Sequence, residues 1–125
     1  MTLDLLPDSY AICRLNPDAA LPAWAAGAFC SITRTPGELS IVCASADVPA
    51  DVLAQREYRG LAVQGPLDFS ELGIVSTLAG TLAAASIGIF VVATYDTDYL
   101  FVRAGDLDRA VAALRGAGHT VATGA

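Results

Sequence analysis

The sequence predicts an α+β fold of two tandem ferredoxin-like units, each with the order β-α-β-β-α-β, an antiparallel sheet and helices on one face. In the second half of the chain, two amphipathic helices alternate with short apolar strands, which is the split-βαβ order. The first half repeats this order more weakly. Hydrophobic residues make up 54% and charged residues 16% of the 125 residues, a composition typical of a tightly packed globule. We therefore expect a degenerate N-terminal unit over residues 1–59 and a C-terminal unit over 60–125.

The second half has the clearer pattern. Asp68 and Glu71 stand three residues apart before an apolar run, a capping-box spacing that predicts a helix start. A second helix is capped by Gly105–Asp106 and ends at the glycines of 116–118. In order, the expected elements are a strand over 60–65, a helix over 72–86, a hairpin of strands over 88–94 and 99–102, a helix with the stripe Leu107, Ala110, Val111 and Leu114, and a strand over 119–121.

The first half follows the same order with weaker signals. Its expected elements are a strand over 10–15, a helix over 17–26, strands over 28–33 and 38–43, a helix over 49–55 and a strand over 58–63. In the hairpin of each unit an acidic residue precedes an apolar strand, so Glu38 takes the place that Asp98 has in the later unit. This local similarity favours a duplication of one unit of about 60 residues.

One segment, from Leu72 to Tyr95, contains no charged residue and is long enough to suggest a membrane span. Within it, however, a helical stripe of apolar residues alternates with small and polar ones, and residues 86–88 interrupt it before a β-branched run over 89–93. No basic residues flank the segment to orient it in a bilayer. A helix followed by a buried strand is therefore favoured over membrane insertion.

The charge balance excludes several function classes. Seven basic residues, all Arg, oppose thirteen acidic ones, for a net charge of −6 and a pI of about 4.4. This excess of acid argues against binding to nucleic acid or to anionic lipid. The absence of Lys excludes Schiff-base chemistry and a P-loop.

The three cysteines lie in apolar, strand-like runs at Cys13, Cys30 and Cys43. Their spacing matches no zinc pattern, so we expect buried free thiols in a reducing cytoplasm, with no metal and no cofactor. The N-terminus lacks the pattern of a signal peptide. The single histidine, His119, follows a helix terminator and is read as a solvated strand residue.

The polar residues suited to a binding site converge on the start of the helix over 72–86 and on the turn of the following hairpin. The helix start offers backbone N–H groups to a carboxylate or phosphate, and Gly73 leaves them accessible. Nearby carboxylates, Asp68, Glu71 and Asp98, suit an ammonium or guanidinium group, so the pattern fits a zwitterionic amino acid. The alternative is that the first two only cap the helix and that Asp96 and Asp98 only shape the turn.

Three spaced motifs resemble the ACT domain: residues 65–75, 87–90 and 94–99, with 38–43 similar to the signature of a first unit. More narrowly, they resemble the bacterial aspartokinase-like proteins built of two ACT units without a catalytic domain, and they are similar to the ACT units of the animal cytosolic arginine sensor. The sequence departs from the family pattern at Ala93 and at Gly80–Thr81, and the arginine sensor has Gly at the position of Asp68.

This resemblance implies a sensor of a small molecule, usually an amino acid, held at an interface between ACT units. It further implies a homodimer and a protein partner that the ligand modulates. The ligand-facing positions carried over from the family are Asp68, Glu71, Gly73, Ile74, Val75, Thr94, Tyr95 and Asp98.

Two other function classes compete with the sensor. A ligand-independent dimerisation or interaction module would use the same fold without binding a metabolite. An enzyme would use Asp96, Asp98 and Glu71 as an acid–base pair or a Mg²⁺ site. The sequence offers it no Lys and no nucleophile–base pair, so we expect no catalysis.

Overall fold

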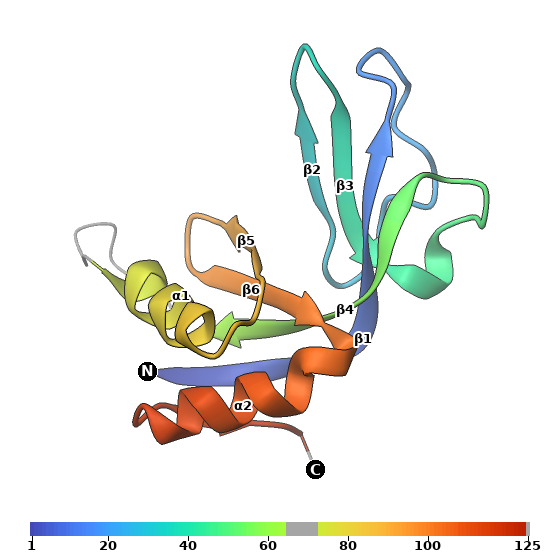
Figure 1. Ribbon diagram of the computed structural model, residues 1–125. Coiled ribbons are helices and arrows are strands. Elements are labelled where there is room, and N and C mark those ends of the chain that lie inside the picture. Colours follow the sequence, from blue (N-terminus) through green and yellow to red (C-terminus); the bar gives the residue numbers. More distant parts are fainter. Residues whose placement is uncertain (65–72, 125) are drawn as a thin grey trace. The chain divides into compact units, whose positions relative to one another are not determined.

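The computed structural model describes residues 1–64 and 73–124. By their internal contacts the residues divide into a larger unit, Met1–Pro7 with Arg59–Ala125, and a smaller unit, Asp8–Tyr58. Two long strands, β1 (Thr2–Leu15) and β4 (Ala54–Val63), contribute residues to both units (Figure 1). The first residues of the chain therefore fold with its second half.

The larger unit contains the β-α-β-β-α-β order expected for the second half of the chain. After β4 its elements are α1 (Ile74–Ala84), β5 (Phe90–Ala93), β6 (Asp98–Arg103), the 3₁₀ turn η2 (Ala104–Asp106), α2 (Leu107–Gly116) and β7 (Thr120–Ala122). Its strands lie in the order β7-β1-β4-β6-β5. β5 and β6 are antiparallel, whereas β7 runs parallel to β1 and pairs Val121 with Leu3.

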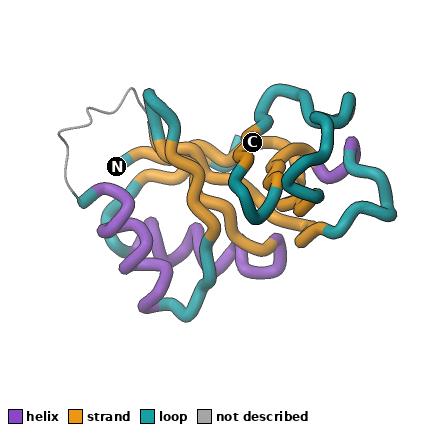
Figure 2. Tube along the Cα trace, turned by 90° about the horizontal axis from the view of Figure 1, so that it is seen from above, coloured by secondary structure: helices purple, strands orange, loops and turns teal. Residues whose placement is uncertain are grey.

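Both helices of the larger unit cover the same face of its strands (Figure 2). Side chains of a strand alternate between faces, so Leu61 and Val63 of β4 point to this side together. Leu78 and Leu82 of α1, one turn apart, pack onto them. The buried residues of this core are Leu3, Leu61, Val63, Leu78, Leu82, Ile87, Leu100, Val102, Ala110, Val111, Leu114 and Val121.

Helix α1 occupies the part of the chain that lacks charge. It spans 11 residues and ends in a turn where Ile87 N donates to Leu82 O at 3.0 Å and Ser86 has a φ of 61°. This left-handed end is a common helix stop, and β5 begins shortly after it. Among residues 1–64 and 73–124, no helix has the length and apolar character that crossing a bilayer requires.

The smaller unit is built from β2 (Ser31–Arg34), β3 (Leu39–Ala44) and the end of β1, which pair antiparallel in the order β2-β3-β1. A 3₁₀ turn, η1 (Ser45–Asp47), follows β3. One face of these strands is buried by loop residues, among them Trp24 and Val52. The core residues that they cover are Ala11, Cys13, Leu39, Ile41, Cys43 and Val48.

The helices expected over 17–26 and 49–55 are wrong, because none of residues 8–58, all of which the structure describes, lies in an α-helix. In the first segment the Asn16 side chain accepts a hydrogen bond from Asp18 N at 2.9 Å, and Pro22 interrupts the alanine-rich run. Such local side-chain bonds and an internal proline both disfavour helix. In the second segment β4 already begins at Ala54. The chain therefore does not form two tandem β-α-β-β-α-β units.

The hairpins of the two units nevertheless have the same type of turn. Thr35 N donates to Glu38 O, and Thr94 N donates to Thr97 O, both at 2.9 Å. The hydroxyl of each first threonine also accepts from the backbone N–H three residues later, at 3.2 and 3.3 Å. Glu38 therefore corresponds to Thr97 in the structure and not to Asp98, one residue away from the alignment expected from the acidic residues.

Candidate ligand-binding site

The predicted site residues that the structure describes all belong to the larger unit and form two groups. Gly73, Ile74 and Val75 lie at the start of α1, while Thr94, Tyr95 and Asp98 lie in the turn between β5 and β6. Asp68 and Glu71 lie outside the described residues.

The start of α1 is a helix N-terminus with accessible backbone donors. Gly73 is the N-cap, with a φ of 79°, and the first intrahelical bond runs from Thr77 N to Gly73 O at 2.7 Å. The N–H groups of residues 74–76 precede that bond, so the helix supplies them with no acceptor. The first turn contains no acidic residue, and the positive end of the helix dipole is therefore not neutralised within the helix.

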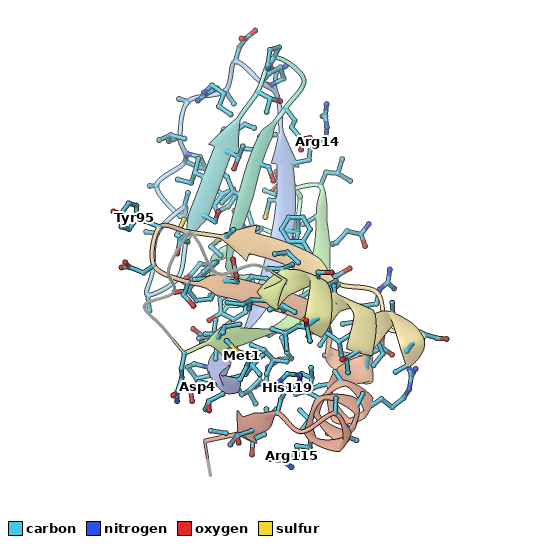
Figure 3. All side chains as sticks on the ribbon, turned by 90° about the vertical axis from the view of Figure 1, so that its left-hand side faces the viewer. Met1, Asp4, Arg14, Tyr95, Arg115 and His119 are labelled. Atoms are coloured by element: carbon cyan, nitrogen blue, oxygen red, sulfur yellow. The ribbon has the colours of Figure 1, made fainter. Side chains whose placement is uncertain are left out.

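The β5–β6 turn is held in shape by its threonines. Thr94 Oγ1 donates to Thr97 O at 3.0 Å, which closes the loop across two residues. Tyr95 is 80% exposed and projects away from the ribbon (Figure 3), and Asp98 is half-buried opposite Ala93. The turn therefore places a hydroxyl, a phenol and a carboxylate within five consecutive residues.

A contact that the sequence did not predict connects this turn to the chain that leads to α1. The hydroxyl of Thr97 donates a hydrogen bond to the backbone carbonyl of Val63, the last residue of β4. The next residue, Gln64, donates its backbone N–H to Thr2 O at 2.8 Å and its side-chain amide to the Asp4 carboxylate at 3.2 and 3.3 Å. The turn and β1 thus fix the end of β4 just before the segment that reaches Gly73.

Thr97 is therefore a positioning residue that the sequence analysis placed in the turn without giving it a role. The sequence contained one signal for this turn, the spacing Thr94-x-x-Thr97. At this spacing the hydroxyl of Thr94 can donate to the backbone carbonyl of Thr97 and so close the turn. The contact of the second hydroxyl with β4 depends on strand pairing, which this spacing does not encode.

The described part of the chain contains neither a metal-binding cluster nor an activated thiol. In residues 1–64 and 73–124, no group of three or more His, Cys, Asp or Glu side chains is arranged to hold a metal ion. Burial raises the pKa of the thiols of Cys13, Cys30 and Cys43, for the last to about 11, so these side chains are protonated at neutral pH. Cys13 and Cys43 are buried and Cys30 is half-buried, and protonated thiols are poor nucleophiles.

Comparison with known proteins identifies the fold. The model of the ACT domain family matches residues 53–116, and a model of a second family's N-terminal domain matches residues 8–51. The chain belongs to the ACT domain family. No curated protein matches it.

Solved structures resemble this chain over most of its length. A protein from Agobacterium tumefaciens is 44% identical, with a TM-score of 0.93, and the match covers 99% of this chain and 93% of that one. A protein of unknown function from Vibrio cholerae is 22% identical, with a TM-score of 0.77, over 92% of this chain and 88% of that one. The regulatory subunit of aspartate kinase from Thermus thermophilus is 12% identical, with a TM-score of 0.60, over 89% and 93%. The last two show a shared fold.

Proposed function

We propose that this chain is a non-catalytic regulatory protein of the cytoplasm that binds an amino acid and thereby modulates a protein partner. Two features of the larger unit carry the proposal, the open N-terminus of α1 and the threonine-braced turn that contains Asp98. The helix N-terminus suits a carboxylate, and the carboxylate of Asp98 suits an ammonium group. Membership of the ACT domain family and the likeness to an aspartate kinase regulatory subunit support the same function.

The ligand would be held by Gly73, Ile74 and Val75 through their backbone and by Thr94, Tyr95 and Asp98 through the turn. Asp68 and Glu71 complete the proposed site. We expect no cofactor, and we expect the chain to work as a homodimer without nucleic acid or membrane. A ligand that binds one arrangement of the dimer more tightly than another shifts the dimer toward that arrangement. This shift changes the affinity of the dimer for its protein partner, typically by about 1–3 kcal/mol.

A thermal-shift screen against the twenty amino acids tests this function. A ligand at 100 times its Kd adds about 2.7 kcal/mol to the free energy of unfolding, which corresponds to several degrees in Tm for a domain of this size. Asp98→Ala should abolish the shift caused by the amino acid that binds. Asp96→Ala is the matched control, because Asp96 is an exposed carboxylate of the same turn and not one of the proposed ligand residues.

The second candidate is a ligand-independent dimerisation module. It predicts a folded protein, free of co-purified metabolite, whose Tm no amino acid raises and whose self-association tolerates Asp98→Ala. That result would reject the sensor.

A further inference from the structure

Two of the three cysteines, Cys30 and Cys43, face each other in the hairpin of the smaller unit. Strands β2 and β3 lie side by side (Figure 1), and their register pairs Ser31 with Val42. One step beyond that pair, the same register places Cys30 opposite Cys43. Cys43 is fully buried, whereas Cys30 is half-buried next to the edge strand and packs against the same core.

The position of Phe29 supports this extension of the register. The same spacing places Phe29 opposite Ala44, which pairs on its other side with Tyr10 of β1. The rings of Phe29 and Tyr10 are in edge-to-face contact, with their centroids 5.8 Å apart. The chain therefore still follows β3 at residues 29 and 30. Because side chains alternate between faces, Cys30 points away from Phe29, to the face on which Cys43 is buried.

The hydrogen-bond pattern of the hairpin determines how closely the two cysteines approach. At its turn Thr35 N donates to Glu38 O at 2.9 Å, so these residues form a hydrogen-bonded pair. Hydrogen-bonded and non-hydrogen-bonded pairs alternate along an antiparallel ladder, and the two cysteines lie an odd number of steps from the turn pair. They therefore form a non-hydrogen-bonded pair, whose Cα atoms are about 4.5 Å apart. A disulfide bridges Cα atoms about 4.4–6.8 Å apart, so this position can accept one.

The third cysteine, Cys13, lies too far from the other two to form a disulfide. It pairs with Ile41 and is thus a diagonal neighbour of Cys43 across β1 and β3. Diagonal neighbours have Cα atoms about 7–8 Å apart, beyond the limit of about 7 Å for a disulfide. Strand β3 separates Cys13 from Cys30, and two strand spacings amount to about 9.5 Å. The register thus selects one of the three possible pairs.

We propose that Cys30 and Cys43 are a redox-active pair, which a small disulfide such as oxidised glutathione converts into a cross-strand disulfide. Cys30 is the more accessible thiol, so its thiolate attacks one sulfur of oxidised glutathione and releases one molecule of reduced glutathione. The thiolate of Cys43 then attacks the Cys30 sulfur of this mixed disulfide and releases the second molecule. Two electrons and two protons pass from the protein thiols to the glutathione.

The environment of the pair determines the rate of this exchange and its effect on stability. Burial raises the pKa of both thiols, so the exchange should be slow at neutral pH and faster as the pH rises. The bond would fix to β3 the end of the loop whose residues Trp24 and Ala25 cover the core. A cross-link also restricts the unfolded chain, so the oxidised protein should have a Tm several degrees higher than the reduced protein.

Equilibration in glutathione buffers at mildly alkaline pH tests the pair. The protein is quenched with acid, its remaining thiols are alkylated, and its tryptic peptides are analysed by mass spectrometry. Cleavage after arginine places each cysteine in a peptide of its own, over residues 1–14, 15–34 and 35–56. In oxidising buffer we expect peptides 15–34 and 35–56 to be linked, at a mass two hydrogens below their sum, and Cys13 to be alkylated.

Three variants separate the two steps. Cys43→Ala should stop the reaction at the mixed disulfide, so the protein gains the mass of one glutathione at Cys30. Cys30→Ser should leave Cys43 as a thiol. Cys13→Ala is the matched control and should form the same bond as the unaltered protein. Cys43→Ala removes a fully buried thiol and lowers stability, but the peptide map of the unaltered protein decides without it.

The proposal is overturned if Cys30 and Cys43 of the unaltered protein remain thiols in the most oxidising buffer, or if the linked peptides contain Cys13. It is also overturned if the mixed disulfide persists on Cys30, or if the bond joins two chains on a non-reducing gel. Each of these results would mean that the two cysteines serve only as small apolar side chains of this core. The amino-acid screen is independent, because its site belongs to the larger unit.

Discussion

The hydroxyl of Thr97 donates a hydrogen bond to the backbone carbonyl of Val63, and so joins the turn of the β5–β6 hairpin to the end of β4. In the smaller unit Glu38 occupies the equivalent turn position. The two turns share their backbone hydrogen bonds, but Glu38 has no hydroxyl with which to make the contact of Thr97. The additional hydroxyl contact belongs to the larger unit, which also contains the proposed site.

Replacing Thr97 by Val removes the hydroxyl at nearly constant volume. We expect the free energy of unfolding to fall by about 1 kcal/mol, because the Val63 carbonyl loses its hydrogen-bond donor. Affinity for the bound amino acid should fall as well, since the turn is less well positioned. Urea denaturation measures the first effect. Thr33→Val, at an exposed position of β2, is the control and should change stability much less.

Two glycines of the α1 region should respond to alanine with opposite signs. Gly73 has a φ of 79°, so Gly73→Ala should cost about 1 kcal/mol of stability. Gly80 lies within α1, and a Cβ there meets no atom within 4 Å, so Gly80→Ala should add up to about 1 kcal/mol. Thermal unfolding of both variants measures the difference. Equal effects would contradict the left-handed conformation at Gly73.

Gly60 makes a close backbone approach in the larger unit. A Cβ at this position would stand 2.9 Å from Leu6 Cδ1 and 2.9 Å from Cε1 of the fully buried Phe101 ring. Gly60→Ala should therefore destabilise by about 1–3 kcal/mol through overpacking. Combining it with Phe101→Leu should cost less than the sum of the two single changes, because the smaller side chain makes room. If the losses in the free energy of unfolding, measured by denaturant, are strictly additive, the close approach of Gly60 to Phe101 is contradicted.

The cysteines make stability depend on alkaline pH. Burial, assisted by Cys13, Cys30 and Asp47, raises the pKa of the Cys43 thiol from 9.0 to about 11. The unfolded chain thus releases this proton at lower pH than the folded one, so the stabilisation is complete below about pH 9 and is lost as pH rises to about 11. The loss from Cys43 should reach roughly 2 kcal/mol. Cys43→Ala should flatten the pH profile in this range, although its stability at pH 7 is lower.

The order of elements in the larger unit and the α+β class could be predicted from the sequence alone. Its apolar stripes at helical spacing and its alternating strands are local signals, and they correctly favoured a short helix and a strand over a membrane span between Leu72 and Tyr95. The hairpin turns were also predictable, because Thr, Asp and Gly act on the backbone within a few residues. The family resemblance, since confirmed, rested on the same local motifs.

Which segments fold together depends on long-range contacts that no local pattern predicts. Residues 1–7 join the larger unit through the pairing of β1 with β7, a contact between the two ends of the chain that no local pattern encodes. The alanine-rich segment over 17–26 has high helix propensity, yet it covers the strands of the smaller unit as a loop, because Trp24 and Ala25 pack on the sheet and Arg34 donates to Ala19 O at 2.8 Å. Packing and long-range hydrogen bonds outweigh propensities of a few tenths of a kcal/mol per residue, on the order given by peptide scales. For the same reason, the contact of Thr97 with Val63 could be found only in three dimensions.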